Sequence, residues 1–301
     1  MIVYRELSSL EKDLGLSAKT LYTLSNKIFR HYRKVSIPKD NGQFRELSVP
    51  DDFLKAVQRK IADVLLSQME ISPYATAYRP GGSTLRNAKP HVGKSMVMKL
   101  DIRGFFDHCI YTLVKEKAFP AEKYSEANRI LLTLLCVYKE ALPQGAPTSP
   151  AISNILLKDF DNTVGAWCHE KNIAYTRYCD DMTFSGEFDH RQVKALVKAE
   201  LRKLGFFLND KKTVVLRDGQ RKSVTGIVVN EKPQASAEYR RKLRQELYYC
   251  RKFGFCDHIR SLGLNISVEA YKARLLGRVN YALSVNPKDQ QMQRYKAWLT
   301  G

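Results

Sequence analysis

Two adjacent aspartates between two strand-like runs are the sequence feature that most constrains the fold. The runs cover residues 173–178 and 182–185, and Asp180 and Asp181 stand between them. Two short runs of this kind joined by a polar turn predict a β-hairpin. Helical and strand patterns alternate irregularly along the rest of the chain, so the sequence predicts an α+β fold with the two acids at a hairpin tip.

A third aspartate leaves another apolar strand. In residues 96–102 the apolar side chains at every second position share one face, which leaves Lys99 and Asp101 on the other. We therefore expect Asp101 to point away from the core. Clustered carboxylates need a cation, and Mg²⁺ prefers such hard oxygen ligands. An Asp-Asp pair taken alone is more often a helix cap or a solvated turn.

The charge balance points to a polyanionic partner. Among 301 residues, 50 are Lys or Arg and 31 are Asp or Glu, which gives a net charge of +19. Basic residues are concentrated in 240–301, where tyrosine and phenylalanine are interleaved with them, a pattern that suits nucleic acid. A solvated basic helical face is the plain alternative. We expect no membrane partner, because the longest uncharged stretch, 141–157, contains three prolines.

Cysteine usage and the N-terminal sequence bear on the compartment. Acidic residues interrupt the N-terminus before any apolar run develops, so no secretory signal is expected. The six cysteines include no Cys-x-x-Cys pair and are expected to be reduced thiols. These features together favour a cytoplasmic protein.

Other patterns predict the elements around the acids. Expected are a helix capped by Ser17, a helix behind Asp51, a hairpin over 37–50 around Asn41-Gly42, a loop 142–150 that feeds a helix capped by Ser149, a helix over 193–204, strands over 213–216 and 224–229, and helices over 240–301.

Several motifs resemble those of reverse transcriptases. Tyr178-Cys179-Asp180-Asp181 resembles the Tyr-x-Asp-Asp box, 101–106 resembles the palm aspartate motif, and 142–145 resembles the nucleotide-positioning motif, in matching order and spacing. Asn87-Ala-Lys-Pro-His91 and Val224-Thr-Gly226 are similar to elements that mark bacterial retron reverse transcriptases. The resemblance runs from about 37 to 230. Group II intron enzymes normally add further domains, for which the remaining residues leave little room.

This resemblance implies a right-hand polymerase fold with fingers, a palm built on an antiparallel sheet, and a helical thumb. The expected boundaries are 1–95 for the N-terminal helices and fingers, 96–235 for the palm with a fingers-derived segment around 110–140, and 236–301 for the basic thumb.

The resemblance also implies catalytic roles. Asp101 and Asp180 would hold two Mg²⁺ ions, with Asp181 nearby and the Ile102 carbonyl assisting. Lys212 resembles the lysine that protonates the pyrophosphate leaving group, and Lys211 is the alternative for that role.

Further residues would contact the incoming nucleotide. Phe106 falls where an aromatic ring underlies the sugar and excludes a 2′-hydroxyl, and one of Phe105 and Phe106 is expected to belong to the core. Gln144 and Gly145 would lie under the nucleotide and the template base, with glycine allowing close backbone approach. A helix-capping loop is the alternative for this pair.

Two cations and one unusual residue complete the predicted site. Lys39 and Arg45 flank the predicted fingers hairpin and could clamp the β- and γ-phosphates. Cys179 stands where retron enzymes usually have alanine, and we expect altered packing there rather than lost activity. Two interpretations stay open for Asn87 and His91: they support the fold, or they contact RNA. The same two interpretations apply to residues 224–226.

The implied reaction is RNA-templated DNA synthesis from dNTPs. A cognate non-coding RNA would serve as primer, through a guanosine 2′-hydroxyl, and as template, giving RNA-linked single-stranded DNA. A role in antiphage defence with a separate effector protein is also implied, and no ribonuclease H domain is visible. The alternatives are a reverse transcriptase primed from a 3′-hydroxyl, a non-catalytic RNA-binding scaffold, and an RNA-dependent RNA polymerase.

Overall fold

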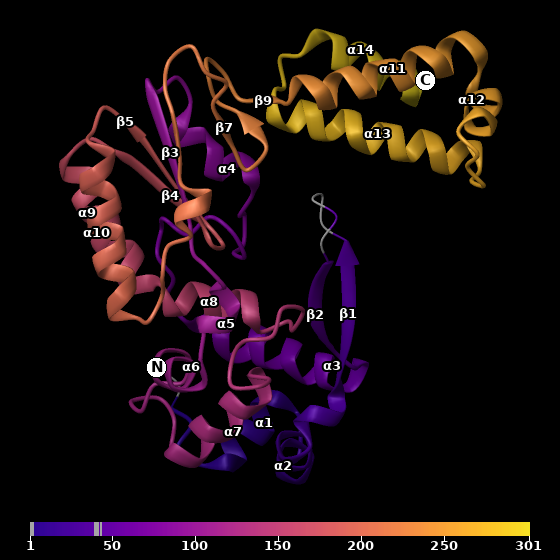
Figure 1. Cartoon of the computed structure of the whole chain (residues 1–301). Coiled ribbons are helices and arrows are strands. Elements are labelled where there is room, and N and C mark those ends of the chain that lie inside the picture. Colours follow the sequence, from indigo (N-terminus) through magenta and orange to yellow (C-terminus); the bar gives the residue numbers. More distant parts are fainter. Residues whose placement is uncertain (1–2, 39–41, 43) are drawn as a thin grey trace. The chain divides into compact units, whose positions relative to one another are not determined.

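A computed structural model gives the structure of residues 3–38, 42 and 44–301 (Figure 1). The chain forms two compact units, each assembled from separate stretches. The first unit comprises Met1–Gly82, Met98–Phe184 and Phe188–Val214, and the second comprises Ser83–Val97, Ser185–Glu187 and Val215–Gly301. The three-part division predicted from the sequence is a different partition and stays a prediction.

The first unit is rich in short helices. Two predicted N-caps are confirmed: the Ser17 side chain accepts a hydrogen bond from the Thr20 amide at 3.2 Å, and Asp51 accepts one from Leu54 at 2.9 Å. Its helices are α1 (Leu7–Leu14), α2 (Ala18–Asn26), η1 (Ile28–His31), α3 (Asp52–Lys60), η2 (Ile61–Leu65), η3 (Leu66–Gln68), α5 (Phe105–His108), α6 (Tyr111–Ala118), α7 (Glu126–Cys136), α8 (Ser149–Leu156), α9 (Lys158–Glu170), α10 (His190–Lys203) and η5 (Asp210–Lys212).

The predicted N-terminal hairpin is confirmed but begins earlier. Strands β1 (Tyr32–Pro38) and β2 (Phe44–Pro50) pair antiparallel over their full length. The start is fixed by Tyr32, whose ring stacks on Tyr138 at 4.4 Å between centroids and whose hydroxyl accepts a hydrogen bond from the buried Gln58 amide at 2.8 Å. Asn41 of the predicted turn and Lys39 lie outside the described residues.

A four-stranded sheet in the order β4-β5-β3-β6 carries the acids. Its strands are β3 (Met96–Asp101), β4 (Ala174–Tyr178), β5 (Asp181–Gly186) and β6 (Val214–Leu216), and helices α9 and α10 run beside β4 and β5 in Figure 1. The expectation that β3 is buried on one face only was wrong. Val97 is fully buried, Lys99 is half-buried and Asp101 is 4% exposed, so side chains on both faces of β3 are covered.

The start of helix α8 also differs from the prediction by one residue. Thr148 occupies the N-cap position and Ser149 is the first helical residue. The Ser149 hydroxyl instead donates to the Pro143 carbonyl at 2.8 Å. That bond closes the preceding loop, so the serine is not free to cap the helix.

The second unit combines a small sheet with a helical C-terminal segment. The predicted strand over 224–229 was wrong, because Thr225 and Gly226 have positive φ angles of 45° and 81° and turn the chain between β7 and β8. The predicted helices over 240–301 are confirmed. The elements are α4 (Thr84–Ala88), η4 (Lys89–His91), β7 (Ser223–Val224), β8 (Ile227–Val228), β9 (Gln234–Ala235), α11 (Ala237–Phe253), α12 (Phe255–Ser261), α13 (Val268–Val285) and α14 (Gln290–Thr300).

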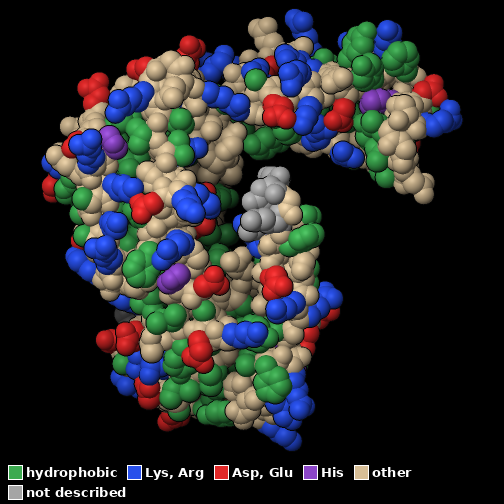
Figure 2. Space-filling model, in the orientation of Figure 1, with side chains coloured by type: hydrophobic (Ala, Val, Ile, Leu, Met, Phe, Trp, Pro, Cys, Tyr) green, Lys and Arg blue, Asp and Glu red, His purple; other side chains and the backbone are tan. Residues whose placement is uncertain are grey.

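The C-terminal helices have their own core. Leu243 and Leu247 of α11 pack with Tyr271, Leu275 and Val279 of α13 in one buried cluster. Burial of these large apolar side chains leaves the basic residues outside, and Figure 2 shows Lys and Arg side chains distributed over these helices.

Within the described residues, no helix has both the length and the apolar character needed to cross a bilayer. All six cysteines are free thiols, as predicted, and only Cys256 among them is exposed.

Candidate active site

A pocket of about 550 Å³ in the first unit gathers most of the predicted site residues. The sequence-predicted residues that line it are Arg45, Asp101, Ile102, Phe105, Phe106, Gln144, Asp180, Asp181 and Lys212. Gly145 is adjacent to this lining, and Lys39 lies outside the described residues. The pocket also includes Phe44, Glu46, Tyr78, Gly104, Asp107, Tyr178, Cys179 and Asn209.

Backbone geometry brings the acidic strand ends together. Asp101 is the last residue of β3, and Asp180 stands in the turn between β4 and β5. The Ile102 amide donates to the Asp180 carbonyl at 3.1 Å, which joins the two strand ends. Cys179 has a φ of 60°, a left-handed conformation that turns the chain sharply before the two acids.

The Asp101 carboxylate is held by two donors from one loop. Lys212 Nζ donates to Oδ2 at 2.7 Å, and Asn209 Nδ2 donates to Oδ1 at 3.1 Å. The hydrogen bond to Asp101 raises the pKa of Lys212, so the ammonium stays charged. Lys211 does not line the pocket, which favours Lys212 of the two predicted candidates.

Like charges concentrate around Asp181. Its pKa is raised to about 6, first by desolvation and then by the neighbouring charges of Asp180 and Asp101. Repulsion of this kind is relieved by a cation, and carboxylate oxygens are suitable ligands for a hard divalent ion. No three His, Cys, Asp or Glu side chains among the residues that the structure describes form a ready-made metal cage. Two carboxylates completed by substrate oxygens fit the usual coordination of Mg²⁺ better than such a cage.

The two phenylalanines differ in their surroundings. Phe105 is 3% exposed and packs against Phe206 at 5.6 Å between ring centroids. Phe106 is half-buried and lines the pocket. Phe105 is therefore the core residue of the pair, and Phe106 is the ring that a ligand in the pocket could touch.

The loop containing Gln144 packs on the N-terminal hairpin. The Ser48 amide of β2 donates to the Gln144 carbonyl at 3.1 Å. Gly145 has a φ of 123°, and a Cβ there would lie 3.0 Å from the Ser48 carbonyl oxygen. The absence of a side chain at Gly145 is thus required by contact with β2, within the protein itself.

Two of the pocket residues that sequence reasoning did not single out, Asn209 and Tyr78, make polar contacts within the site. Asn209 lies three positions before Lys212, and only the fold shows that both donate to Asp101. The Tyr78 hydroxyl donates to Cys179 Sγ at 3.4 Å, but a single tyrosine in a loop gives no pattern that could identify it.

The two segments similar to retron elements meet inside the second unit. Asn87 Nδ2 donates to Thr225 Oγ1 at 3.4 Å, and the Thr225 hydroxyl donates to the Thr84 carbonyl at 3.1 Å. His91 is fully buried beside the Ser185 hydroxyl at 2.7 Å, and burial lowers its pKa to about 3. These contacts support the structural interpretation of both segments.

Comparison with known proteins identifies the family. Residues 37–266 match the family model described as "Reverse transcriptase (RNA-dependent DNA polymerase)". The retron Mx65 reverse transcriptase of Myxococcus xanthus is 32% identical over 96% of this chain and 70% of that protein. The retron Ec86 enzyme of Escherichia coli is 29% identical over 91% and 88%, and the retron Ec83 enzyme is 33% identical over 73% and 75%.

Among solved structures, an apo telomerase from Candida tropicalis aligns with a TM-score of 0.47 and 15% identity, over 68% of this chain and 55% of that one. This structural likeness is too low to add to the sequence matches. Those matches confirm the expected polymerase fold and activity, and the chain belongs to the reverse transcriptases, RNA-directed DNA polymerases, with the bacterial retron enzymes as its relatives.

Proposed function

We propose that the pocket around Asp101, Asp180 and Asp181 is the site of DNA synthesis and that the enzyme copies its own cognate non-coding RNA. The observation that carries the proposal is the convergence of these carboxylates with Lys212, Phe106 and Arg45 on one pocket. An acidic centre flanked by cations and a ring suits a nucleoside triphosphate, whose phosphates need positive charge and whose sugar needs an apolar surface.

Each side chain has a role that follows from its place. Arg45 presents a guanidinium fork that suits the phosphates of a dNTP. Phe106 would lie against the sugar and exclude a 2′-hydroxyl by contact. Lys212, kept charged by Asp101, would supply a proton to the departing pyrophosphate.

Catalysis in this family depends on divalent metal, and we propose two Mg²⁺ ions held by Asp101, Asp180 and Asp181, with the Ile102 carbonyl. Bound Mg²⁺ would lower the pKa of the attacking hydroxyl and neutralise negative charge on the triphosphate. The protein's own contribution is to hold the carboxylates near one another despite their repulsion.

The priming step is the finer part of the proposal. We propose that synthesis starts from a guanosine 2′-hydroxyl of the cognate RNA and gives branched, RNA-linked single-stranded DNA. The similarity of 87–91 and 224–226 to retron elements supports it. The same proposal gives the complex a cytoplasmic role in antiphage defence, with a separate effector protein as partner.

The test is to express the enzyme with its native flanking DNA and to sequence the nucleic acid that co-purifies. We expect DNA joined to RNA at an internal guanosine 2′-hydroxyl. The Asp180→Asn/Asp181→Asn variant should retain the RNA but carry no DNA, because the substitutions remove the charges that would attract metal. Asp257→Asn, at an exposed carboxylate on α12, is the matched control and should make normal product.

Two results would contradict these proposals. DNA joined to an RNA 3′ end would replace the branched priming by conventional priming. Normal DNA synthesis by the double variant would remove the proposed catalytic centre.

A further inference from the structure

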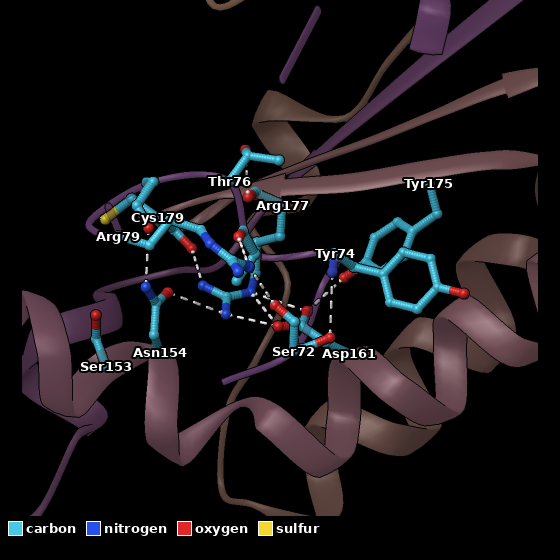
Figure 3. Close-up of polar contacts among 12 residues, drawn as sticks. Ser72, Tyr74, Thr76, Arg79, Ser153, Asn154, Asp161, Tyr175, Arg177 and Cys179 are labelled. Carbon is cyan, nitrogen blue, oxygen red and sulfur yellow. Dashed lines mark hydrogen bonds and ion pairs between the residues drawn. The ribbon is translucent and has the colours of Figure 1, made fainter. Parts of the chain in front are cut away.

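A fully buried arginine lies directly behind the two acids. Arg177 of β4 is 0% exposed. Its Nε and Nη2 donate to the Asp161 carboxylate of α9 at 2.6–3.0 Å, and its Nη1 donates to the Cys179 carbonyl at 2.8 Å (Figure 3). One rigid guanidinium therefore joins a helix to the turn that bears Asp180.

The surrounding groups fix the orientation of this guanidinium. Asp161 also accepts a hydrogen bond from the Tyr175 hydroxyl at 2.7 Å, and Arg177 Nη2 reaches Asn154 Oδ1 at 3.3 Å. The Asn154 amide in turn donates to the Ala77 carbonyl at 2.9 Å. Both partners of the ion pair are thus held by neutral groups from other elements.

The arginine backbone is anchored as well. The Arg177 amide donates to the Tyr74 carbonyl at 2.9 Å, and the Thr76 amide and hydroxyl donate to the Arg177 carbonyl at 2.8 and 2.9 Å. Figure 3 shows these residues on the loop beside β4. With both ends fixed, the side chain has little freedom to follow a shift of the turn.

Stability alone does not account for such an arrangement. Removing two charges from water is costly, and apolar residues of similar volume often stabilise a core equally well. What apolar residues cannot provide is a donor aimed at the Cys179 carbonyl. That carbonyl belongs to the peptide whose nitrogen is the amide of Asp180, and Cys179 holds a left-handed φ of 60°.

We propose that Arg177 is a positioning residue for DNA synthesis, whose bond to the Cys179 carbonyl fixes the peptide before Asp180 and thereby aims the Asp180 and Asp181 carboxylates at the pocket. Asp161 holds the guanidinium in the required plane. This inference rests on the proposed catalytic role of Asp180, since the orientation of the turn matters only if its carboxylates act.

The first test compares Arg177→Lys with Tyr175→Phe. Lysine can pair with Asp161, but its single ammonium cannot at the same time donate to the Cys179 carbonyl, as Nη1 of the guanidinium does. We expect kcat to fall about 100-fold with little change in KM for dNTP, the scale of loss typical of a misplaced catalytic group. Tyr175→Phe removes a hydrogen bond from the same cluster without touching the turn, so it should lower Tm similarly and keep the wild-type kcat.

A readout independent of catalysis is the binding of Mn²⁺ to the full-length protein, measured by electron paramagnetic resonance. Arg177→Lys should weaken it, and Tyr175→Phe should not. Wild-type kcat and Mn²⁺ binding in Arg177→Lys would overturn the inference.

A second variant separates positioning from folding. Asp161→Leu/Tyr175→Phe/Arg177→Met replaces the ion pair and the hydroxyl that donates to Asp161 by apolar groups, so it should recover Tm relative to Arg177→Lys while kcat stays low, because the carbonyl still lacks its donor. Recovery of kcat together with Tm would show a structural role only. If Asp180→Asn itself kept full activity, the proposed catalytic site would fail, whatever the result at Arg177.

Discussion

Phe106 and Phe105 are neighbours in the sequence, yet we propose that only Phe106 discriminates between sugars. Both residues line the pocket that holds Asp101, but Phe105 is 3% exposed and packs against Phe206, whereas Phe106 is half-buried. In the proposed role, the Phe106 ring would act by excluding volume, so its effect should depend on size rather than on polarity.

Replacing Phe106 by alanine should therefore admit ribonucleotides. We expect the ratio of kcat/KM for dNTP over rNTP to fall by at least tenfold, which corresponds to about 1.4 kcal/mol of lost discrimination. Single-nucleotide extension with each triphosphate measures it. Phe105→Ala is the control: it should cost about 3–5 kcal/mol of folding free energy by opening a cavity. Unchanged sugar preference in Phe106→Ala would rule out the gate.

At the scale of elements, helix α9 approaches a loop closely enough to require glycine. A Cβ on Gly165 would lie 2.0 Å from the Tyr74 ring, whereas a Cβ on Gly277 of α13 would meet no atom within 4 Å. An added side chain would therefore clash at one of these helical glycines and be accommodated at the other. Gly165 permits packing, and Gly277 costs helix stability without any visible contact in return.

The same substitution should consequently have opposite effects at the two positions. Gly165→Ala should destabilise the protein by about 1–3 kcal/mol through overpacking, and Gly277→Ala should stabilise it by about 0.5–1 kcal/mol. Urea unfolding of both variants measures the difference. A neutral Gly165→Ala would mean that the Tyr74 ring can move aside without cost.

Elements governed by local patterns could be predicted from the sequence. The hairpin that carries Asp180 and the strand that ends at Asp101 follow from alternation over a few residues, and the caps at Ser17 and Asp51 follow from hydrogen bonds within one turn. The cap of α8 could not be predicted, because a bond from Ser149 to Pro143 competes for the same hydroxyl.

The chemical surroundings of the site depended on contacts between distant segments. Asn209 acquires its role only when its loop folds against Asp101, and Arg177 only when α9 places Asp161 beside β4. The predicted place of Gly145 under the nucleotide and the template base stays a prediction, and the structure shows a protein neighbour that the sequence did not indicate, the Ser48 carbonyl. Such partners are fixed by tertiary packing, which periodicity does not encode.

For the whole molecule, the net charge of +19 should dominate the affinity for RNA. Each phosphate neutralised releases counterions, so binding should weaken steeply with salt. Replacing Arg241 and Arg251, two exposed cations of α11, by glutamine should make the slope of log K against log salt less steep by about 1.4, if each contacts one single-stranded phosphate.

Filter binding or fluorescence anisotropy at several salt concentrations measures this slope. Asp257→Asn serves as the control, because it leaves every cation in place and should not make the slope less steep. An unchanged slope in the arginine variant would show that the RNA phosphates contact cations other than Arg241 and Arg251.

The distribution of buried and exposed cysteines has a practical consequence for fluorescent labelling of this enzyme. Five thiols are buried, and burial raises the pKa of Cys109, Cys136, Cys168, Cys179 and Cys250, whereas Cys256 on α12 is open to solvent. A maleimide dye should therefore label the native chain at one place, without mutagenesis. The unmodified sequence already provides an attachment point for fluorescence experiments that follow the C-terminal helices as RNA is engaged and copied.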